Sequence, residues 1–350
     1  SDGALPIYPE GIYMQLLIIA PSWVGDILIS NSLMRHLKKQ YPQAMLDVFV
    51  PAYAKDLVEA MPEARHSWLS PLQHGELSLK KRYLLAQPLK KKHYDAVYIL
   101  PNSFKSALIP FFARIDKRIG YIGEWRYPLL TEARKLDVTR HPLMVERYNA
   151  LAYSPDTDPA TLNTLYPHLV LNQETVDLTL AKFSLTPPYI VFCPGAEYGP
   201  AKRWPHYHYA ALAKHLNQEG YPVLLLGSKK DQSVSEAIIN EGIHQNALIN
   251  LTGKTSLKEA IALIQAASAI ISNDSGLMHI AAALDKPLVA LFGPTSPQFT
   301  PPLSKKAQVL RLIEGFEKVR VGQDSKEGYH QSLIDLSPKK VKKALDQVLK

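Results

Sequence analysis

A helix start suited to an anion is predicted where residues 269–272, an apolar strand, meet residues 274–284, an amphipathic helix. The first amides of such a helix are unpaired donors at the positive end of its dipole, and Gly276 lets an anion approach the backbone closely. The competing interpretation is structural: Asp274 or Ser275 only caps the helix, and His279 is a core histidine. The candidate phosphate-contacting residues are Asp274, Ser275, Gly276, Leu277, Met278 and His279.

A second candidate is the glycine-containing loop 195–205, which follows a strand predicted at 189–193 and carries Lys202 and Arg203. A lysine supplies a point charge and an arginine a planar fork, so the two could neutralise a diphosphate. Negative charge on a diphosphate leaving group grows as its bond breaks, and cations there would stabilise it. Alternatively, both cations are surface residues and Trp204 belongs to the core.

Two carboxylates extend this set. Asp26 opens a helix after the loop 21–25 and could act as a general base on a hydroxyl, although an acid in a first helical turn is common and stabilising by itself. Asp231, in the loop 227–231 after another strand, could accept hydrogen bonds from ribose hydroxyls or simply be solvated.

Other chemistries lack support in the sequence. His206 and His208 are two residues apart and fall on different faces of a helix, so we expect no zinc pair there. No Walker A run and no dinucleotide fingerprint occur. The single cysteine, Cys193, excludes an intrachain disulfide.

Composition indicates a globular protein: of 350 residues, 46% are apolar and 21% charged. The sequence contains no run of about 18 apolar residues, so we predict no membrane span. The net charge of +8 is uneven, with 13 Lys or Arg against 4 Asp or Glu in residues 80–135. Such a field favours an anionic partner, or the lysines are solvated helix faces. No nucleic-acid reader motif appears, so nucleic acid is not an expected partner.

Short apolar runs alternate with amphipathic stretches throughout, which predicts βαβ units and parallel sheets. We predict an α/β protein of two halves, each binding its ligand beyond the carboxyl ends of its strands. The predicted divisions are a leader or expression remnant (1–13), an N-terminal domain (14–185), a C-terminal domain (186–336) and a last helix (337–350).

Taken together, the segments resemble the lipopolysaccharide heptosyltransferases of glycosyltransferase family 9, from about Met14 to the C-terminus. Within the family, the resemblance is greatest to members that add the second heptose of the inner core. The segments that carry it are APSWVGD at 20–26, LPNSFKSALIPFF at 100–112, PLMVERY at 142–148, CPGAEYGPAKRWPHYHYA at 193–210, NDSGLMHIAAAL at 273–284 and GYHQSLIDL at 328–336.

This resemblance implies the GT-B architecture: two facing Rossmann-like, doubly wound domains with a cleft between them. The N-terminal domain (14–185) would bind the acceptor and the C-terminal domain (186–336) the nucleotide sugar, and in this family the last helix often packs back on the first domain. It implies inverting transfer of L-glycero-D-manno-heptose from ADP-heptose to the first heptose of the lipopolysaccharide inner core. Asp26 would be the base, Lys202 would contact the donor phosphates, Asp274 would lie near the donor sugar and Asp231 would hold the ribose. Arg203 occupies a variable position of the family, so its role is inferred from charge alone.

The implied acceptor is an acidic glycolipid at the cytoplasmic face of an inner membrane. We therefore expect Asn102, Ser103 and Lys105, with part of the basic segment 80–135, to meet this acceptor or its membrane surface. We expect a peripheral, cytoplasmic monomer that requires no cofactor, with stimulation by Mg²⁺ left open. The alternatives are a heptosyltransferase for another core acceptor, a nucleotide-sugar epimerase, or a two-lobed binding protein without catalysis.

Overall fold

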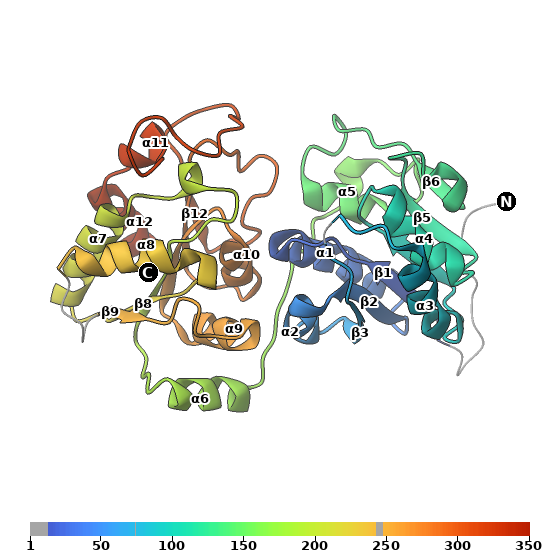
Figure 1. The fold of residues 1–350 in the computed structure, drawn as a ribbon, viewed down its shortest axis with the longest axis horizontal. Coiled ribbons are helices and arrows are strands. Elements are labelled where there is room, and N and C mark those ends of the chain that lie inside the picture. Colours follow the sequence, from blue (N-terminus) through green and yellow to red (C-terminus); the bar gives the residue numbers. More distant parts are fainter. Residues whose placement is uncertain (1–12, 74, 243–247) are drawn as a thin grey trace. The chain divides into compact units, whose positions relative to one another are not determined.

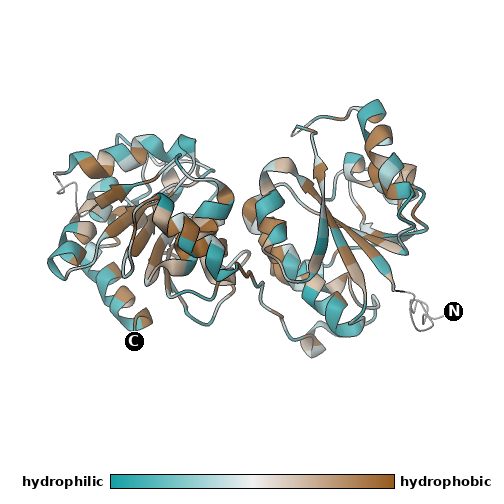
Figure 2. Cartoon of the chain, turned by 90° about the horizontal axis from the view of Figure 1, so that it is seen from below, coloured by the Kyte–Doolittle hydropathy of each residue, from teal (hydrophilic) through white to brown (hydrophobic). Residues whose placement is uncertain are grey.

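The computed structural model describes residues 13–73, 75–242 and 248–350, so the leader predicted at 1–13 lies almost wholly outside it. The chain forms two compact units that meet in sequence between His168 and Leu169. We call them the N-terminal unit and the C-terminal unit (Figure 1). In each, apolar strands form the centre and the polar residues lie mainly on the surrounding helices and loops (Figure 2).

The N-terminal unit contains one six-stranded sheet in the order β3-β2-β1-β4-β5-β6, with every strand pair parallel. Its strands are β1 (Gln15–Ile19), β2 (Met45–Pro51), β3 (Ala64–Ser70), β4 (Ala96–Ile99), β5 (Lys117–Tyr121) and β6 (Glu132–Arg134). Its α-helices are α1 (Val24–Gln40), α2 (Lys55–Glu59), α3 (Leu79–Lys90), α4 (Phe104–Phe112) and α5 (Met144–Ala150).

The C-terminal unit repeats this plan, with the parallel sheet order β12-β11-β10-β7-β8-β9. Its strands are β7 (Ile190–Cys193), β8 (Val223–Leu225), β9 (Leu248–Asn250), β10 (Ala269–Asn273), β11 (Leu288–Leu291) and β12 (Ala307–Leu310). Its α-helices are α6 (Gln173–Lys182), α7 (His206–Gln218), α8 (Gln232–Asn240), α9 (Leu257–Ala266), α10 (Gly276–Ala283), α11 (Gln331–Ile334) and α12 (Pro338–Val348).

The strand order places one switch point in each sheet. The first strand of each unit lies beside the fourth, as β1 beside β4 and β7 beside β10. The chain leaves these two neighbours toward opposite sides of the sheet, which opens a crevice at their carboxyl ends where doubly wound folds bind ligands. The loops that follow these four strands are therefore where a site is expected.

The division between the units is fixed by hydrogen bonds on either side of one peptide bond. On one side, the amide of His168 donates to Asn31 Oδ1 of α1 at 2.8 Å. On the other, the amide of Leu169 donates to the carbonyl of Ala283 in α10 at 3.0 Å. The helix α6, which follows, packs against α9. The division thus comes earlier than the one predicted after residue 185, and α6 belongs to the C-terminal unit.

The last helix also belongs to the C-terminal unit. Ser337 caps α12 by accepting from the amide of Lys340, as its Ser-Pro start predicts. Val341 and Leu345 are fully buried in the core of this unit, where α12 packs on α7, β10, β11 and β12. Packing of this helix on the first domain, which the family resemblance implies, stays a prediction.

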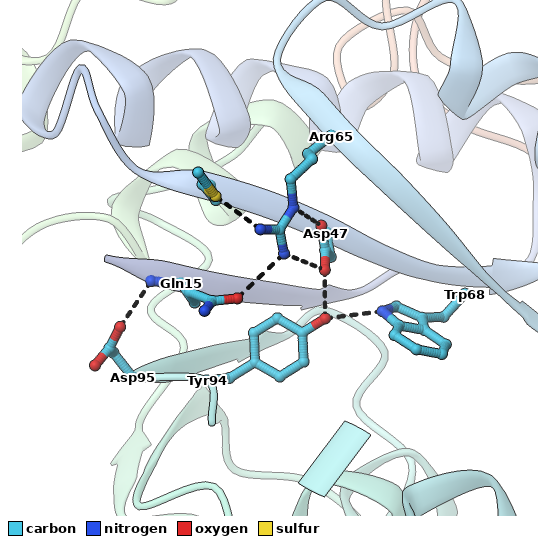
Figure 3. A network of polar contacts seen from close by, with 7 residues as sticks. Gln15, Asp47, Arg65, Trp68, Tyr94 and Asp95 are labelled. Atoms are coloured by element: carbon cyan, nitrogen blue, oxygen red, sulfur yellow. Dashed lines mark hydrogen bonds and ion pairs between the residues drawn. The ribbon is translucent and has the colours of Figure 1, made fainter. Parts of the chain in front are cut away.

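A buried polar network ties four parts of the N-terminal sheet together (Figure 3). Asp47 of β2, whose side chain is 1% exposed, accepts two bonds from Arg65 of β3, at 2.8 and 2.7 Å. Its second oxygen also accepts from Tyr94 Oη at 2.5 Å, and Trp68 Nε1 donates to the same hydroxyl at 2.8 Å. Asp47 and Arg65 lie in the first halves of β2 and β3, and Tyr94 precedes β4, so the centre of the network is away from the carboxyl edge of the sheet.

We expect Asp47→Ala to lower the free energy of unfolding by about 3–5 kcal/mol, because it leaves the Arg65 charge and the Tyr94 hydroxyl without their acceptor. Urea unfolding followed by circular dichroism measures this loss. The control is Glu59→Ala, which removes an exposed partner of Lys55 at 3.4 Å and should cost less than about 1 kcal/mol. Equal losses in the two variants would contradict a stabilising role for the buried network.

Candidate functional site

In the C-terminal unit, Asn273 joins the loop after β7 to the end of β10. Its side chain is fully buried, and its Nδ2 donates to the carbonyl of Pro194 at 2.8 Å. Its Oδ1 accepts from the amide of Trp204 at 3.0 Å and from Tyr209 Oη at 3.1 Å. Since both segments leave neighbouring parallel strands, this amide holds the cationic loop against the start of α10.

Lys202 and Asp274 meet at this edge. Lys202 Nζ lies 2.6 Å from Asp274 Oδ2, and the side chains are 17% and 11% exposed. The same carboxylate oxygen accepts from Thr295 Oγ1 at 2.8 Å, and the ammonium lies 5.6 Å from the centre of the Tyr198 ring. The structure thus brings a predicted phosphate-binding lysine together with a predicted sugar-binding carboxylate.

Ordinary capping does not account for the start of α10. Ser275 is the residue before the helix, and its side chain makes no capping bond to the first turn. Asp274 points its carboxylate to Lys202 instead, so the first-turn amides of Gly276, Leu277 and Met278 receive no side-chain cap from either residue. These amides are suitable donors for an anion.

His279, in the second turn of α10, matches its core interpretation. It is 8% exposed, and burial, aided by the nearby Lys202, lowers the pKa of His279 to about 4 although Asp274 opposes the shift. The imidazole is therefore neutral at pH 7, and the positive charge near this helix start comes from lysine and arginine rather than from histidine.

Arg203 and Asp231 form a looser second pair. The guanidinium Nη2 lies 3.7 Å from Asp231 Oδ1, while the buried Arg203 Nε has no hydrogen-bond partner. Asp231 Oδ2 accepts from the amide and the hydroxyl of Ser228 at 2.9 and 2.8 Å. A Cβ on Gly195 would lie 2.3 Å from the Asp231 carboxylate, so only glycine allows this acid to pack over the loop after β7. Trp204 is fully buried, as its core interpretation predicts.

In the N-terminal unit, Asp26 lies in the first turn of α1, directly after β1. Burial raises the pKa of Asp26 to about 6, even though a helix start favours a negative charge. Its neighbourhood includes Tyr148 of α5, whose pKa is raised by burial and then by the Asp26 charge. A carboxylate with this pKa is largely ionised at pH 7 and still able to accept a proton.

The predicted acceptor residues follow the neighbouring strand, β4. Asn102 Oδ1 accepts from Arg126 at 3.1 Å, Ser103 precedes α4, and the Lys105 carbonyl accepts from Arg82 at 3.0 Å. Asp26 and these residues therefore lie at the carboxyl ends of β1 and β4, on the two sides of the switch point of this sheet. Asn102 Oδ1 and the carbonyl of Lys105 have partners within the unit, and acceptor binding by these three residues stays a prediction.

Comparison with known proteins identifies the family of this chain. A model for glycosyltransferase family 9 (heptosyltransferase) matches residues 82–330. The lipopolysaccharide heptosyltransferase 2 of Salmonella typhimurium is 53% identical over 344 residues, covering 96% of this chain and 99% of that protein. That of Escherichia coli strain K12 is 52% identical over 348 residues, with the same coverage.

The chain belongs to glycosyltransferase family 9. The solved structure of E. coli ADP-heptose LPS heptosyltransferase II matches it with a TM-score of 0.87 and 48% identity, over 96% of this chain and 98% of that one. The predicted α/β class with two Rossmann-like domains of GT-B type is confirmed. The family member described here is a glycosyltransferase, which removes the alternative of a binding protein without catalysis.

Two buried residues of this glycosyltransferase were missed by sequence reasoning. Asn273 was included only in a family segment, and Arg126 only in a count of basic residues. Arg126 is fully buried, donates to the carbonyls of Pro101 and Tyr121 and to Ser106 Oγ at 2.9 Å, and burial lowers the pKa of Arg126 to about 10. It joins the loop after β4 to the loop after β5, and no local pattern distinguishes it from a surface arginine.

The part of the chain that the structure describes contains no cluster of three His, Cys, Asp or Glu side chains able to hold a metal ion. His206 Nδ1 bonds Tyr329 Oη at 2.8 Å, and His208 Nε2 bonds the carbonyl of Ile334 at 2.8 Å. These two imidazoles therefore have structural partners. In the same residues, no helix combines the length and apolarity that crossing a membrane would need.

We expect Asp26→Asn to raise the free energy of unfolding at pH 8 by up to about 3 kcal/mol, because a pKa near 6 in the folded state and 3.8 in the unfolded state penalises the buried charge. The folded state binds the proton more tightly, so the wild type loses stability as pH rises from about 4 to 6. The advantage of the variant should therefore vanish below pH 4. Urea unfolding at pH 4, 6 and 8 measures it.

The matched control for that experiment is Glu174→Gln, because Glu174 is also an acid in a first helical turn but is exposed. Neutralising it removes only the favourable dipole interaction, so stability should stay level or fall by a few tenths of a kcal/mol. A gain at pH 8 in the control equal to that of Asp26→Asn would show that burial is not the cause.

Proposed function

We propose that this protein transfers heptose from ADP-heptose to the first heptose of the lipopolysaccharide inner core, with inversion at the anomeric carbon. The relatives named lipopolysaccharide heptosyltransferase 2, at 52–53% identity along nearly the whole chain, support this donor and acceptor. The observation on which the mechanism rests is the pairing of Lys202 with Asp274 beside the uncapped start of α10.

When the donor binds, its diphosphate would replace Asp274 and Asp231 as the partner of Lys202 and Arg203. In the unliganded site, Lys202 faces Asp274 and Arg203 faces Asp231, so the charges balance. A diphosphate brings its own negative charge, which Lys202, Arg203 and the first amides of α10 can share. Asp231 is then free to accept from ribose hydroxyls, and Asp274 to accept from hydroxyls of the donor sugar.

On the acceptor side, Asp26 would act as the base. Its carboxylate takes the proton of the acceptor hydroxyl as the oxygen forms a bond to the anomeric carbon of the heptose. The bond between that carbon and the β-phosphate oxygen breaks in the same step, and its electron pair leaves with ADP. Lys202 and the helix amides stabilise the charge that develops on the leaving diphosphate.

The test is a pair of variants with opposite kinetic signatures. Asp26→Asn should lower kcat at least about a hundredfold without changing ADP affinity, because it removes the base and leaves the C-terminal unit intact. In the wild type, kcat/KM should fall below about pH 6, where Asp26 becomes protonated. Transfer is measured by mass spectrometry with ADP-heptose and a core acceptor that carries one heptose, and ADP binding by calorimetry.

Lys202→Gln is the counterpart of Asp26→Asn. It should weaken ADP binding roughly tenfold or more, because a charged bond to a phosphate contributes about 1.5–3 kcal/mol. Full transfer by Asp26→Asn would remove Asp26 from the mechanism. Transfer onto a core without heptose, but not onto a core with one, would show that the acceptor is a different one.

We also propose that this enzyme binds the cytoplasmic surface of an anionic membrane through a basic aromatic face on α3 and α4. On this face Tyr83 packs edge-on to Phe112 at 5.8 Å, Phe112 packs against Phe111 at 5.9 Å, and Arg118 lies 5.7 Å from the Phe111 ring centre. Other exposed residues on α3 and directly after it are Leu79, Lys80, Lys81, Leu84, Lys90, Lys91 and Lys92. Apolar rings bordered by lysines are suited to a negatively charged lipid surface.

We expect Lys90→Glu/Lys91→Glu/Lys92→Glu to abolish sedimentation with vesicles of phosphatidylglycerol, because each lysine near an anionic surface contributes about 1 kcal/mol. Vesicles of phosphatidylcholine should bind neither protein. The control is Lys339→Glu/Lys340→Glu/Lys343→Glu, which makes the same charge change on exposed positions of α12. Equal binding by the two triple variants would refute this membrane face.

A further inference from the structure

A second cationic site lies in the N-terminal unit, at the carboxyl ends of β5 and β6. A cavity of about 260 Å³ opens there, and a single water occupies about 30 Å³ of liquid, so the space suits a larger group. It is not at the switch point, which lies between β1 and β4. Its walls are formed by Tyr121, Ala133, Arg134, Lys135, Asp137, Arg140, His141, Ala150, Tyr153, Ser154, Pro155, Thr157 and Leu162.

The charge of this cavity is positive. Arg134, Lys135 and Arg140 line the cavity with one carboxylate, Asp137, and Arg134 is also paired with Glu132, whose Oε2 lies 3.1 Å from its Nη2. The Asp137 carboxylate is already engaged, because its Oδ1 accepts from the amide and hydroxyl of Thr139 at 2.9 and 2.6 Å and from the amide of Arg140 at 3.2 Å. The cavity therefore offers more positive charge than its own residues neutralise.

Two buried nitrogen atoms in the wall lack partners. Arg134 is 12% exposed and held rigidly, since its Nη1 donates to the carbonyls of Ala150 and Tyr153 at 2.8 and 2.7 Å. Its Nε nevertheless has no hydrogen-bond partner, and neither does Nδ1 of His141. An unpaired buried donor is costly, so the Arg134 Nε–H would gain from an acceptor that reaches it, and so would His141 Nδ1 in the tautomer that protonates this atom.

We infer that this cavity is an oxyanion site that takes a phosphate or carboxylate group. An oxyanion has enough acceptor positions for the Arg134 Nε–H, an imidazole N–H and the flexible cations Lys135 and Arg140 together. The inference rests on the proposed function in naming the source of that group, which is the acidic glycolipid acceptor.

The helix α5 relates this cavity to the reacting end of the acceptor. The helix α1, which carries Asp26, packs against α5, and Ala150 at the end of α5 lines the cavity. An acceptor whose hydroxyl reaches Asp26 would thus hold its acidic group roughly one helix width away, about 10 Å. The site would bind the acceptor and set its register without taking part in the bond exchange.

The test neutralises the two exposed cations with Lys135→Gln/Arg140→Gln in the full-length enzyme. The KM for an acidic acceptor should rise about tenfold, the loss of about 1.4 kcal/mol, with kcat and the KM for ADP-heptose unchanged. With an acceptor that lacks the acidic group, wild type and variant should behave alike. Lys339→Gln/Lys343→Gln, which removes two charges from exposed positions of α12, should change none of these constants.

A second variant guards against a purely structural effect. Ala133→Leu leaves every charge in place but fills part of the cavity, and it should raise the acceptor KM in the same direction. Inorganic phosphate, added with saturating ADP so that the C-terminal unit is occupied, should raise the Tm of the wild type and not of the double variant.

These measurements distinguish an acidic group of the acceptor from free phosphate, and they test the oxyanion site separately from heptose transfer. A phosphate-dependent Tm with no change in acceptor KM supports the oxyanion site and assigns it to free phosphate. No change in either measurement overturns the inference while leaving heptose transfer intact. A wild type that transfers heptose to no acceptor defeats the proposed function, and the phosphate measurement still decides whether the cavity binds an oxyanion.

Discussion

The order of the strands decides where each half of this protein can hold a ligand. In both sheets the first and fourth strands are neighbours, and every strand points the same way. The crossovers must therefore depart to opposite sides, which leaves the carboxyl ends of that central pair uncovered. Asp26 follows the first strand of one sheet, and Asp274 follows the fourth strand of the other. Asp26 and Asp274 are far apart in the sequence, yet the same strand order places each of them at the carboxyl end of a central strand of its own sheet.

The two halves use buried charge in different ways. In the C-terminal unit, Lys202 and Arg203 each have a carboxylate partner, so the charges of these pairs balance. In the N-terminal unit, Asp26 is largely buried and has no ion pair among the described residues. Burial disfavours its charged form and so raises the pKa of Asp26. A base needs that property, since a paired carboxylate would hold its charge too firmly to accept a proton.

Local signals predicted much of this fold, because they act within a few residues. The Ser256 and Glu259 spacing predicts a helix start, and both capping bonds form. The central strands β1, β7 and β10 are apolar on both faces and were found for that reason. The edge strand β6, with only three residues and no apolar run, gave no such signal.

Properties that depend on distant contacts were not predictable. The division after His168 depends on Asn31, a residue of α1 that carries no mark in the sequence. The roles of Arg126 and Asn273 come from loops that meet only in the folded chain. The sequence could nominate Asp26 as a base, but its pKa follows from how deeply α1 is packed.

The burial of α12 in the C-terminal core affects the order in which the two units fold during synthesis. The core of the C-terminal unit includes Val341 and Leu345, and Trp204, beside Lys202 and Arg203, donates its indole N–H to the carbonyl of Leu336 at 2.7 Å. Domains fold as units from the N-terminus during synthesis. The N-terminal unit is complete once residue 168 has left the ribosome. The C-terminal unit must wait until α12 has been made, so a nascent chain completes the unit that carries Asp26 well before the unit that carries Lys202 and Arg203.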